Sequence, residues 1–418
     1  MTLPLPICLQ PYTEGTDKRE HHQWFYFKAS NLLGIRHCRF RIMNAGSSSY
    51  PAAWPGTWAV TSYGDQAEWR RTPTTYDSAT GELCVEVDPA GHPFLYVAYF
   101  TPFSYEQHLA LIKNCVAAKD HDGSKLCAVE TLCTTKQGRE IHKVTCGSGP
   151  RQLWFIARQH PGESMAEWWA KGMLARLLCA QDDLARALRT NATLHVVPNM
   201  NPDGAVMGHL RTNACGANLN REWAPTGDYM APTRERSPEV FAVLEQVKKT
   251  GCDLFVDVHG DEELPHIFFA GTQGVAGWND RLAELYRLFA TAQLRACPAF
   301  QLEHGYGNEN IGEANLAICA DHIANRFDCL AVTLEMPYKD TLELREPVHG
   351  WSAQRCERLG ASMLDAVADV LPYLRSDFPF ANGGIGDGME TPHWVKPGHA
   401  NPPSAAPFDT TPPSLSAE

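Results

Sequence analysis

Apolar and polar positions alternate in short stretches between residues 22 and 100, which is the pattern of half-buried β-strands. Turn-forming residues at 44–47 and 88–91 separate one stretch from the next. Short strands at regular spacing predict an antiparallel β-sandwich. The predicted strands cover residues 22–28, 38–43, 58–63, 83–87 and 94–100.

A different pattern begins after residue 101, where apolar runs of strand length alternate with longer amphipathic stretches. The runs predict strands at 153–157, 193–197, 253–258 and 330–335. The amphipathic stretches predict a helix capped by Ser104, a helix at 238–249 capped by Ser237, and further helices at 164–179, 277–296 and 351–371. This alternation predicts an α/β fold in which helices flank both faces of a mixed, mainly parallel sheet.

The two patterns and the composition of the tail divide the chain into three parts. Residues 1–101 are predicted to form the β-sandwich domain and residues 102–375 the α/β domain, because 418 residues exceed a typical single core. After residue 375 the chain is rich in glycine and proline, and such a composition cannot build a core. Residues 376–418 are therefore expected to be disordered.

Charge and cysteine content narrow the class of protein. A net charge of −12 argues against a nucleic-acid or anionic-membrane partner. The first residues lack a basic region followed by an apolar run, and no stretch approaches the roughly 20 apolar residues of a membrane span. The 14 cysteines are scattered through apolar segments, which favours reduced and buried thiols. We therefore expect a cytoplasmic protein.

The first chemical motif lies where the predicted strand 153–157 ends and the helix 164–179 begins. Pro161 and Gly162 break the strand, and His160 and Glu163 flank them. Open α/β sheets bind ligands at the carboxyl ends of their strands, and imidazole and carboxylate groups are both zinc ligands. The alternative is a strand-to-helix turn in which Glu163 favours the helix dipole and His160 is solvated.

A second histidine, His259, follows the apolar strand 253–258 and so lies at the same edge of the predicted sheet. A catalytic zinc site has three protein ligands and an open position for water, and His160, Glu163 and His259 fit such a set. Asp257 points to the same side of its strand as His259, which makes it a candidate partner for that imidazole. The alternative for both strand-end residues is plain solvation.

Glu335 closes the apolar strand 330–335, where a carboxylate is costly unless it is paired, hydrogen-bonded or at the sheet edge. A carboxylate at this position could take a proton from a metal-activated water and pass it to a leaving amine. The alternative is an ion pair with Arg326 or Lys339.

The loop 208–223 places two arginines among amide side chains and glycines. The planar guanidinium group of arginine matches a carboxylate with two parallel hydrogen bonds. Arg211, Asn220 and Arg221 are therefore candidates for binding an anionic group. The alternative is a solvated polar loop.

The order of these motifs resembles the zinc carboxypeptidases, specifically the cytosolic carboxypeptidase branch. Residues 22–27, 69–71 and 99–105 resemble the amino-terminal β domain of that branch. The motifs that carry the resemblance are His-Pro-Gly-Glu at 160–163, Asn-Pro-Asp-Gly at 201–204, Arg211, Asn-Arg at 220–221, His-Gly at 259–260 and Leu-Glu-Met-Pro at 334–337.

The resemblance implies a role for each residue of the expected site. These roles are one zinc ion per chain held by His160, Glu163 and His259, oxyanion stabilisation by Arg211, binding of the terminal carboxylate of the substrate by Asn220 and Arg221, and general base and acid catalysis by Glu335.

Two family features bear on the substrate. Secreted members carry a mobile tyrosine that closes over the substrate, and the nearest counterpart here is Tyr306. Members that remove glutamate need a basic group in the side-chain pocket. Residues 311–317 are expected to line that pocket, and they offer Asn315 rather than arginine, while Arg326 is a further candidate. The side-chain preference therefore stays open.

Three functions are compatible with these residues. The first is a zinc carboxypeptidase that removes carboxy-terminal residues, with acidic residues as one candidate class, from peptides or proteins. The second is a zinc amidase or deacylase that acts on a small N-acyl amino acid. The third is a non-catalytic peptide-binding protein, and the intact Glu335 argues against it because a binding protein does not need a positioned base.

Overall fold

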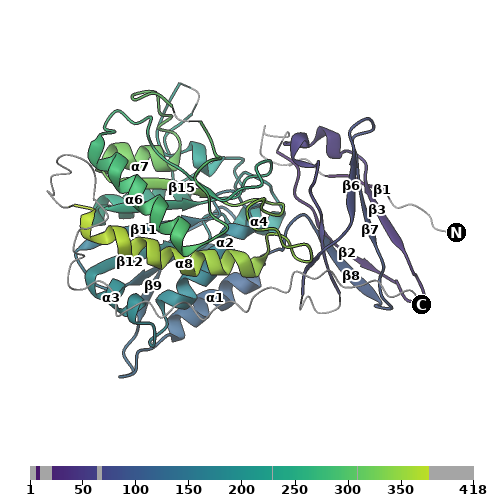
Figure 1. Ribbon diagram of the computed structural model, residues 1–418, viewed down its shortest axis with the longest axis horizontal. Coiled ribbons are helices and arrows are strands. Elements are labelled where there is room, and N and C mark those ends of the chain that lie inside the picture. The colour runs from purple at the N-terminus through teal and green to yellow at the C-terminus, as the bar shows by residue number, and fades with distance from the viewer. Residues whose placement is uncertain (1–5, 10–20, 64–67, 228, 308, 376–418) are drawn as a thin grey trace.

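The computed structural model describes residues 6–9, 21–63, 68–227, 229–307 and 309–375, and these form two parts that lie side by side (Figure 1). The amino-terminal part holds two four-stranded sheets. One sheet has the order β1 (Pro6–Ile7), β3 (Cys38–Ile42), β7 (Glu82–Val87), β6 (Thr74–Asp77). The other has the order β2 (Tyr26–Ser30), β8 (Phe94–Ala98), β4 (Val60–Tyr63), β5 (Arg70–Arg71).

All neighbouring strands of these two sheets run antiparallel except β1 and β3, which pair in parallel. Alternate residues of β7 are buried, as expected for a strand with one face on the core. The predicted antiparallel β domain is therefore confirmed. The strands β1, β5 and β6 were not predicted, because they are short and β5 and β6 show no apolar alternation.

The second part is built on one seven-stranded sheet. Its order is β14 (Phe268–Ala270), β15 (Leu330–Glu335), β13 (Leu254–Val258), β11 (Arg151–Ala157), β12 (Ala192–Val197), β10 (Glu140–Cys146), β9 (Cys127–Thr134). The four strands from β15 to β12 are parallel, and β14, β10 and β9 are antiparallel to their neighbours. This confirms the predicted mixed, mainly parallel sheet.

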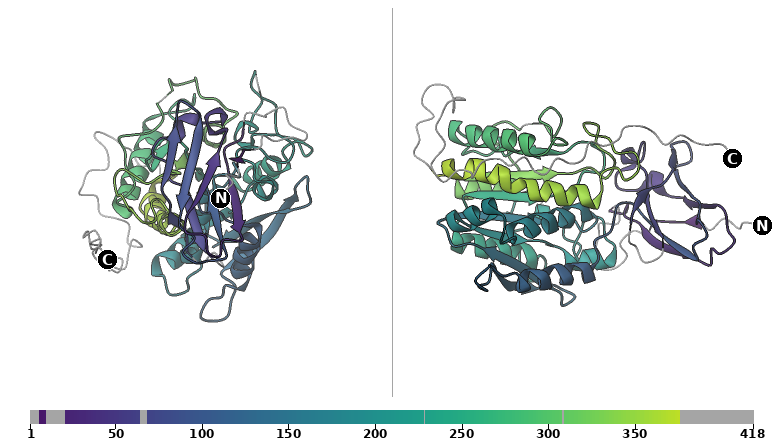
Figure 2. Two further views of the ribbon diagram at one scale, coloured as in Figure 1. Left: turned by 90° about the vertical axis from the view of Figure 1, so that its right-hand side faces the viewer. Right: turned by 60° about the horizontal axis from the view of Figure 1, so that its bottom comes forward.

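Helices cover both faces of the sheet, and the side chains of β11 show how the faces divide. Leu153 and Phe155 point to the face that packs on α1 (Tyr105–Ala117), α2 (Ser164–Leu177), α3 (Asp183–Asn191), α6 (Asp280–Ala296) and α8 (Ala353–Val370). Trp154 and Ile156 point to the other face and pack on α5 (Pro238–Thr250) and α7 (Cys319–Phe327). Figure 2 shows the helices layered on the sheet, with the β domain at one end.

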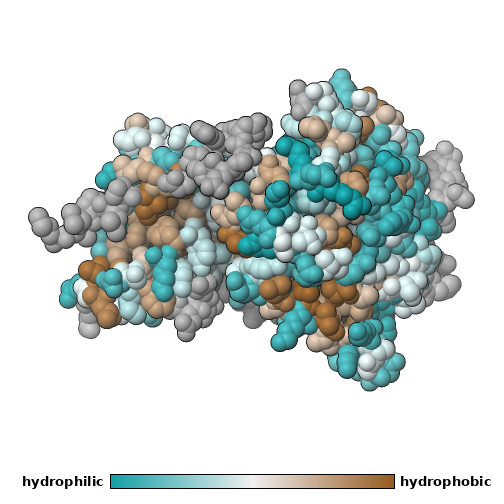
Figure 3. All heavy atoms as spheres, turned by 180° about the vertical axis from the view of Figure 1, so that it is seen from behind, coloured by the Kyte–Doolittle hydropathy of each residue, from teal (hydrophilic) through white to brown (hydrophobic). Residues whose placement is uncertain are grey.

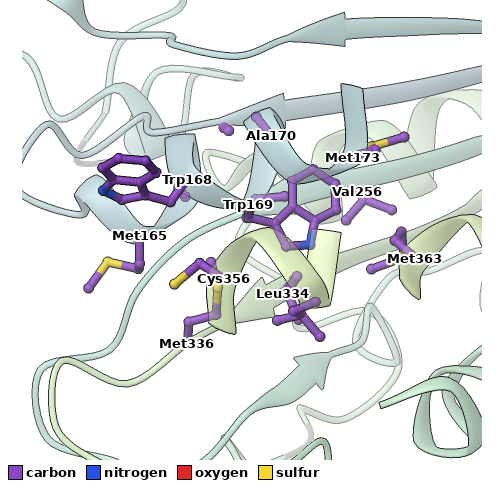
Figure 4. Close-up of a cluster of buried hydrophobic side chains, with 14 of the residues drawn as sticks. Met165, Trp168, Trp169, Ala170, Met173, Val256, Leu334, Met336, Cys356 and Met363 are labelled. Carbon is purple, nitrogen blue, oxygen red and sulfur yellow. The ribbon is translucent and has the colours of Figure 1, made fainter. Parts of the chain in front are cut away.

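Helices α2 and α8 cross at two glycines. A Cβ atom on Gly172 would lie 1.9 Å from the Glu357 carbonyl oxygen, and one on Gly360 would lie 2.0 Å from the Trp169 carbonyl oxygen. Only glycine therefore permits this backbone approach. Figure 4 shows side chains from α2, α8 and the strands β13 and β15 gathered in the core beside this crossing.

The predicted cap of α1 agrees with the structure, whereas the predicted starts of two other helices differ from it. The side chain of Ser104 accepts a hydrogen bond from the Gln107 amide, which completes a capping box for α1. The hydroxyl of Ser237 instead donates to Glu222 Oε2 at 3.1 Å, so Ser237 precedes α5 without capping it through its side chain. The helix predicted from residue 277 begins at Asp280, after the cap Asn279. The predicted tail, residues 376–418, lies outside the described residues.

The surface seen in Figure 3 is mainly hydrophilic over the α/β part, and hydrophobic patches occur on both parts. None of the helices in the described part of the chain combines the length and the apolar character needed to cross a bilayer.

Candidate active site

Three neighbouring parallel strands bring the predicted site residues to one edge of the sheet. Ala157 at the end of β11 pairs with Val258 at the end of β13, and Val258 pairs with Leu334 of β15. The residues that follow these positions therefore meet. Figure 1 shows α4 (Pro202–Met207), which follows the carboxyl end of β12, beside the amino-terminal part, so this edge of the sheet faces the β domain.

The three expected metal ligands converge with their donor atoms on one point. Glu163 contacts His160 Nδ1 through Oε1 at 2.7 Å and His259 Nδ1 through Oε2 at 2.8 Å, and the two Nδ1 atoms are 3.1 Å apart. All three side chains are buried. Two imidazole nitrogens and a carboxylate around one point are the ligand chemistry of zinc.

The outer nitrogen of each imidazole has its own hydrogen-bond partner. Asn218 Oδ1 lies 2.9 Å from His160 Nε2, and Asp257 Oδ2 lies 2.9 Å from His259 Nε2. Such partners place the proton on Nε2 and leave the Nδ1 lone pair free for a metal. The contact between Asp257 and His259 agrees with the strand-alternation argument. Asn218 received no role from the sequence, although it lies in the loop that was singled out.

The turn that carries His160 is braced by Arg158, a residue the sequence did not single out. Arg158 has a positive φ of 62° and is buried. Its guanidinium group donates to the Pro161 carbonyl at 2.9 Å, to the Phe103 carbonyl at 2.8 Å and to Glu167 Oε2 at 2.7 Å. An arginine with three such acceptors fixes the path of the chain between β11 and α2.

Glu335 ends β15 as a buried carboxyl group, and its Oε2 atom has no hydrogen-bond partner in the described part of the chain. Burial is the main cause that raises the pKa of Glu335; His259 acts in the opposite direction, and nearby carboxylates such as Glu163 raise it further. The alternative ion pair with Lys339 is not formed, because Lys339 Nζ donates to the Ala53 and Pro55 carbonyls at 2.9 and 3.3 Å. Arg326 also forms no ion pair with Glu335 among the described residues.

The two arginines of the loop 208–223 lie close enough for their charges to influence each other. Burial lowers the pKa of Arg221, and the positive charge of Arg211 lowers it further. Arg221 Nη1 donates to the Asn220 carbonyl at 2.7 Å. Asn220 Nδ2 lies 3.4 Å from His259 Nε2, while Asn220 Oδ1 accepts from the Cys319 amide at 2.8 Å. A pair of cations beside the metal ligands suits an anionic substrate group.

Two acidic residues after His259 also belong to this region and were not predicted. Glu262 is buried, and its Oε1 has no hydrogen-bond partner among the described residues. Burial, followed by the charge of Glu163, raises the pKa of Glu262 well above its usual range, which favours a neutral acid. Asp261 Oδ2 accepts a hydrogen bond from Tyr306 Oη at 2.6 Å. Tyr306, the nearest counterpart of the mobile tyrosine, therefore contacts an acid two residues after His259, and its role stays a prediction.

Two protein-family models match the chain. The cytosolic carboxypeptidase N-terminal domain matches residues 8–100, and the zinc carboxypeptidase domain matches residues 112–351. An uncharacterized protein of Zymomonas mobilis is 42% identical over 358 residues, which are 86% of this chain and 90% of that protein. Cytosolic carboxypeptidase 4 of Mus musculus is 26% identical over 290 residues, which are 60% of this chain and 26% of that protein. This chain thus matches only a limited part of the mouse relative's length.

Solved structures resemble the whole described fold. A metallo-carboxypeptidase from Pseudomonas aeruginosa, in complex with (2-guanidinoethylmercapto)succinic acid, has a TM-score of 0.81 and 39% identity, over 90% of this chain and 96% of that chain. A metallo-carboxypeptidase from Burkholderia cenocepacia has a TM-score of 0.78 and 40% identity, over 84% of this chain and 90% of that chain. The chain therefore belongs to the zinc carboxypeptidase family, in its cytosolic carboxypeptidase branch, and is a metallocarboxypeptidase.

Proposed function

We propose that this protein removes single residues from the carboxy-terminus of peptides or proteins, with zinc held by His160, Glu163 and His259. The observation that carries the proposal is the meeting of three groups at one sheet edge. A converging His–Glu–His donor set, the buried carboxyl group of Glu335 and the arginine pair of the loop 208–223 all lie there. This combination suits hydrolysis of a peptide bond next to a free carboxylate.

Each side chain then has a defined task. Glu335 takes a proton from the attacking water at its carboxylate and returns it to the leaving amine. Arg211 donates hydrogen bonds to the oxygen that becomes negative in the transition state. Asn220 and Arg221 bind the terminal carboxylate of the substrate. A bound zinc ion would supply Lewis-acid polarisation of the scissile carbonyl and of the water.

The pocket for the terminal side chain sets the preference among substrates. Acidic residues remain one proposed class, and the binding of such a residue would need a cation near Asn315. The ligand of the Pseudomonas aeruginosa relative carries two carboxylates and a guanidinium group, so a basic terminal residue belongs in any test.

The test compares blocked dipeptides that end in glutamate, arginine or phenylalanine, each with a free and with an amidated carboxy-terminus. We expect the wild-type enzyme to cleave the free ends at least ~10²-fold faster, because an amide leaves the desolvated Arg221 without its charged partner. The Arg221→Ala variant should lose most of this preference. A chelator should abolish cleavage and added zinc should restore it.

The same panel separates the alternatives. Equal cleavage of free and amidated ends would point to an amidase or endopeptidase and contradict the proposal. Binding of the free-ended peptides without any turnover by the zinc-loaded protein would point to a peptide-binding protein. Faster cleavage after glutamate than after arginine would support the acidic class, and the reverse order would exclude it.

A further inference from the structure

The residue of interest is Tyr50, which the amino-terminal β domain contributes to the catalytic site. Tyr50 lies in the connection between β3 and β4, between the short helices η1 (Ala45–Ser47) and η2 (Pro51–Ala53). The Cζ atom of Arg211 lies 6.0 Å from the centre of the Tyr50 ring. The sequence around Tyr50 does not predict this contact, because the two residues belong to different domains.

The backbone of Tyr50 is fixed from within its own domain. The buried side chain of Gln23 accepts from the Tyr50 amide at 2.7 Å and donates to the Tyr50 carbonyl at 3.3 Å. The same Gln23 amide group donates to Tyr99 Oη at 3.2 Å. A side chain that pairs with both backbone groups of one residue sets the direction in which that residue points.

The segment that follows Tyr50 is anchored to the catalytic domain. Lys339, four residues after Glu335, donates to the carbonyls of Ala53 and Pro55. Within the β domain, Trp54 packs against Tyr99 with ring centres 5.1 Å apart, and Tyr99 in turn stacks on Tyr338 of the catalytic domain with ring centres 4.5 Å apart. Tyr50 is thus held between a fixed point in its own domain and a fixed point beside the proposed general base.

The electrostatic surroundings of Tyr50 are those of the catalytic site. Burial raises the pKa of Tyr50 to about 12, and the charges that act on it come from Arg211, Glu262, Glu163 and Arg221. The phenol therefore stays neutral. Burial acts to lower the pKa of Arg211, and the charges of Glu262 and Glu163 act in the opposite direction, so Tyr50 and Arg211 share the same charged neighbours.

We propose that Tyr50 is a positioning residue for Arg211, so that the amino-terminal β domain completes the active site rather than only stabilising the catalytic domain. The inference rests on the proposed function, in which Arg211 stabilises the oxyanion. An arginine side chain has many rotamers, and an aromatic face beside the guanidinium group restricts them through a cation–π contact. An oxyanion donor helps only when it is already in place as charge develops.

The experiment measures kcat and KM of the zinc-loaded, full-length protein with a blocked dipeptide that has a free carboxy-terminus. Tyr50→Phe keeps the ring and should behave like the wild type. Tyr50→Leu removes the ring and should lower kcat by roughly 10-fold, part of the ~10²–10³-fold cost of losing one oxyanion donor outright. KM should change by less than about twofold, because a misplaced oxyanion donor weakens transition-state binding more than ground-state binding.

A matched control separates positioning from domain docking. Trp58 lies in the same connection, with Arg71 Cζ 4.7 Å from its ring, and Arg71 donates its amide to the Val348 carbonyl of the catalytic domain at 2.9 Å. Trp58→Leu therefore removes a cation–π contact at the domain junction away from Arg211. This variant should keep the wild-type kcat even if its melting temperature falls.

A double-mutant cycle with Arg211→Met completes the test. If Tyr50 acts through Arg211, Tyr50→Leu should cause no further loss of kcat in the Arg211→Met background. An unchanged kcat in Tyr50→Leu, or an equal loss in both backgrounds, would overturn the inference and leave the proposed function intact. A wild-type enzyme that cleaves no free-ended peptide would overturn both.

Discussion

The imidazole of His259 is held between two carboxylates, Glu163 at Nδ1 and Asp257 at Nε2. Gln159 Nε2 in turn donates to Asp257 Oδ2 at 2.7 Å, so the outer carboxylate is itself oriented. This chain of contacts fixes both the rotation of the ring and the nitrogen that is free to bind a metal. The orientation of this candidate ligand thus depends on residues outside the converging donor set.

We therefore expect Asp257→Ala to lower zinc affinity by roughly 10–100-fold, whereas His160→Ala or His259→Ala should lose the metal almost completely. The control is Asp253→Asn, because Asp253 directly precedes β13, at the end of the strand opposite to Asp257, and its carboxylate contacts Arg375. Zinc affinity is measured by competition with a chelating dye. Equal affinity in Asp257→Ala and the wild type would show that Asp257 does not orient His259.

Glu335→Gln tests the proposed base. Glutamine preserves the shape of the side chain and removes its ability to accept a proton, so turnover should fall by at least ~10²-fold. Zinc content, measured by elemental analysis, should stay at one ion per chain, because Glu335 is not one of the converging ligands. Near-normal turnover would assign a structural role to this buried carboxyl group.

Some residues of the site could be predicted from the sequence, and others could not. His160, His259 and Glu335 could be placed together because each stands at the carboxyl end of a predicted parallel strand, and such ends meet at one sheet edge. Tyr50 could not be placed, since its contact with Arg211 depends on how two domains dock. Glu262 gave no signal either, because an acid in the run 261–263 reads as a solvated turn.

Secondary-structure elements were predictable where the buried positions of the element are mainly apolar. β11, β13 and β15 are mainly apolar. The edge strand β9 is largely exposed and escaped prediction. The buried strand β10 escaped it as well, because His142 and Lys143 occupy buried positions and interrupt its apolar pattern. The short helix α7 was also missed, because its nine residues span fewer than three turns and give only a brief apolar period. The close approach of α2 and α8 could not be predicted either, because the need for Gly172 and Gly360 depends on which helices pack together.

Gly360→Ala should destabilise the protein although alanine is the better helix former. The gain of about 1 kcal/mol from helix propensity is outweighed by the clash with the Trp169 carbonyl, since forced overpacking costs typically ~1–3 kcal/mol or more. Gly277→Ala serves as the control, because its added Cβ would meet no atom within 4 Å. Urea unfolding measures both variants, and a Gly360→Ala variant as stable as Gly277→Ala would contradict the packing argument.

Glu239, in the first turn of α5, should make stability depend on pH. Burial raises its pKa to about 8, and Asn213 Nδ2 donates to its Oε2 atom at 3.2 Å. The unfolded chain releases this proton near pH 4.5, so the folded state binds more protons between about pH 4.5 and 8. The free energy of unfolding contributed by Glu239 is therefore highest below that window and falls across it, by a few kcal/mol in order of magnitude.

Glu239→Gln removes this dependence and keeps the shape of the side chain. The free energy of unfolding of the variant minus that of the wild type should be larger at pH 8 than at pH 5. Urea unfolding at both pH values measures this difference. The same stability difference at pH 5 and pH 8 would show that Glu239 has an ordinary pKa in the folded protein.

The two domains share one hydrophobic core. A single cluster of buried side chains runs from Phe25 and Trp54 through Tyr99 to Tyr338 and on to α2 and α8. The rings of Tyr99 and Tyr338 stack with centres 4.5 Å apart, and both are buried. Because Tyr338 follows Glu335 by three residues, the core of the β domain supports the segment that carries the proposed base.

This continuity predicts that the wild-type protein unfolds in one calorimetric transition, since neither domain can expose its side of the cluster without exposing the other. Tyr99→Ala should destabilise the whole molecule by ~3–5 kcal/mol, the usual cost of removing a buried aromatic ring. Loss of activity, which reports on the catalytic domain, should follow the same lowered transition as the heat signal. Tyr96→Ala is the control, because Tyr96 lies on β8, which ends one residue before Tyr99, and packs with Tyr26 and Phe94 away from the junction. Two separate transitions in the wild type, or a Tyr99→Ala variant whose catalytic domain melts at the wild-type temperature, would show that the domains are independent and that their contact is not part of one core.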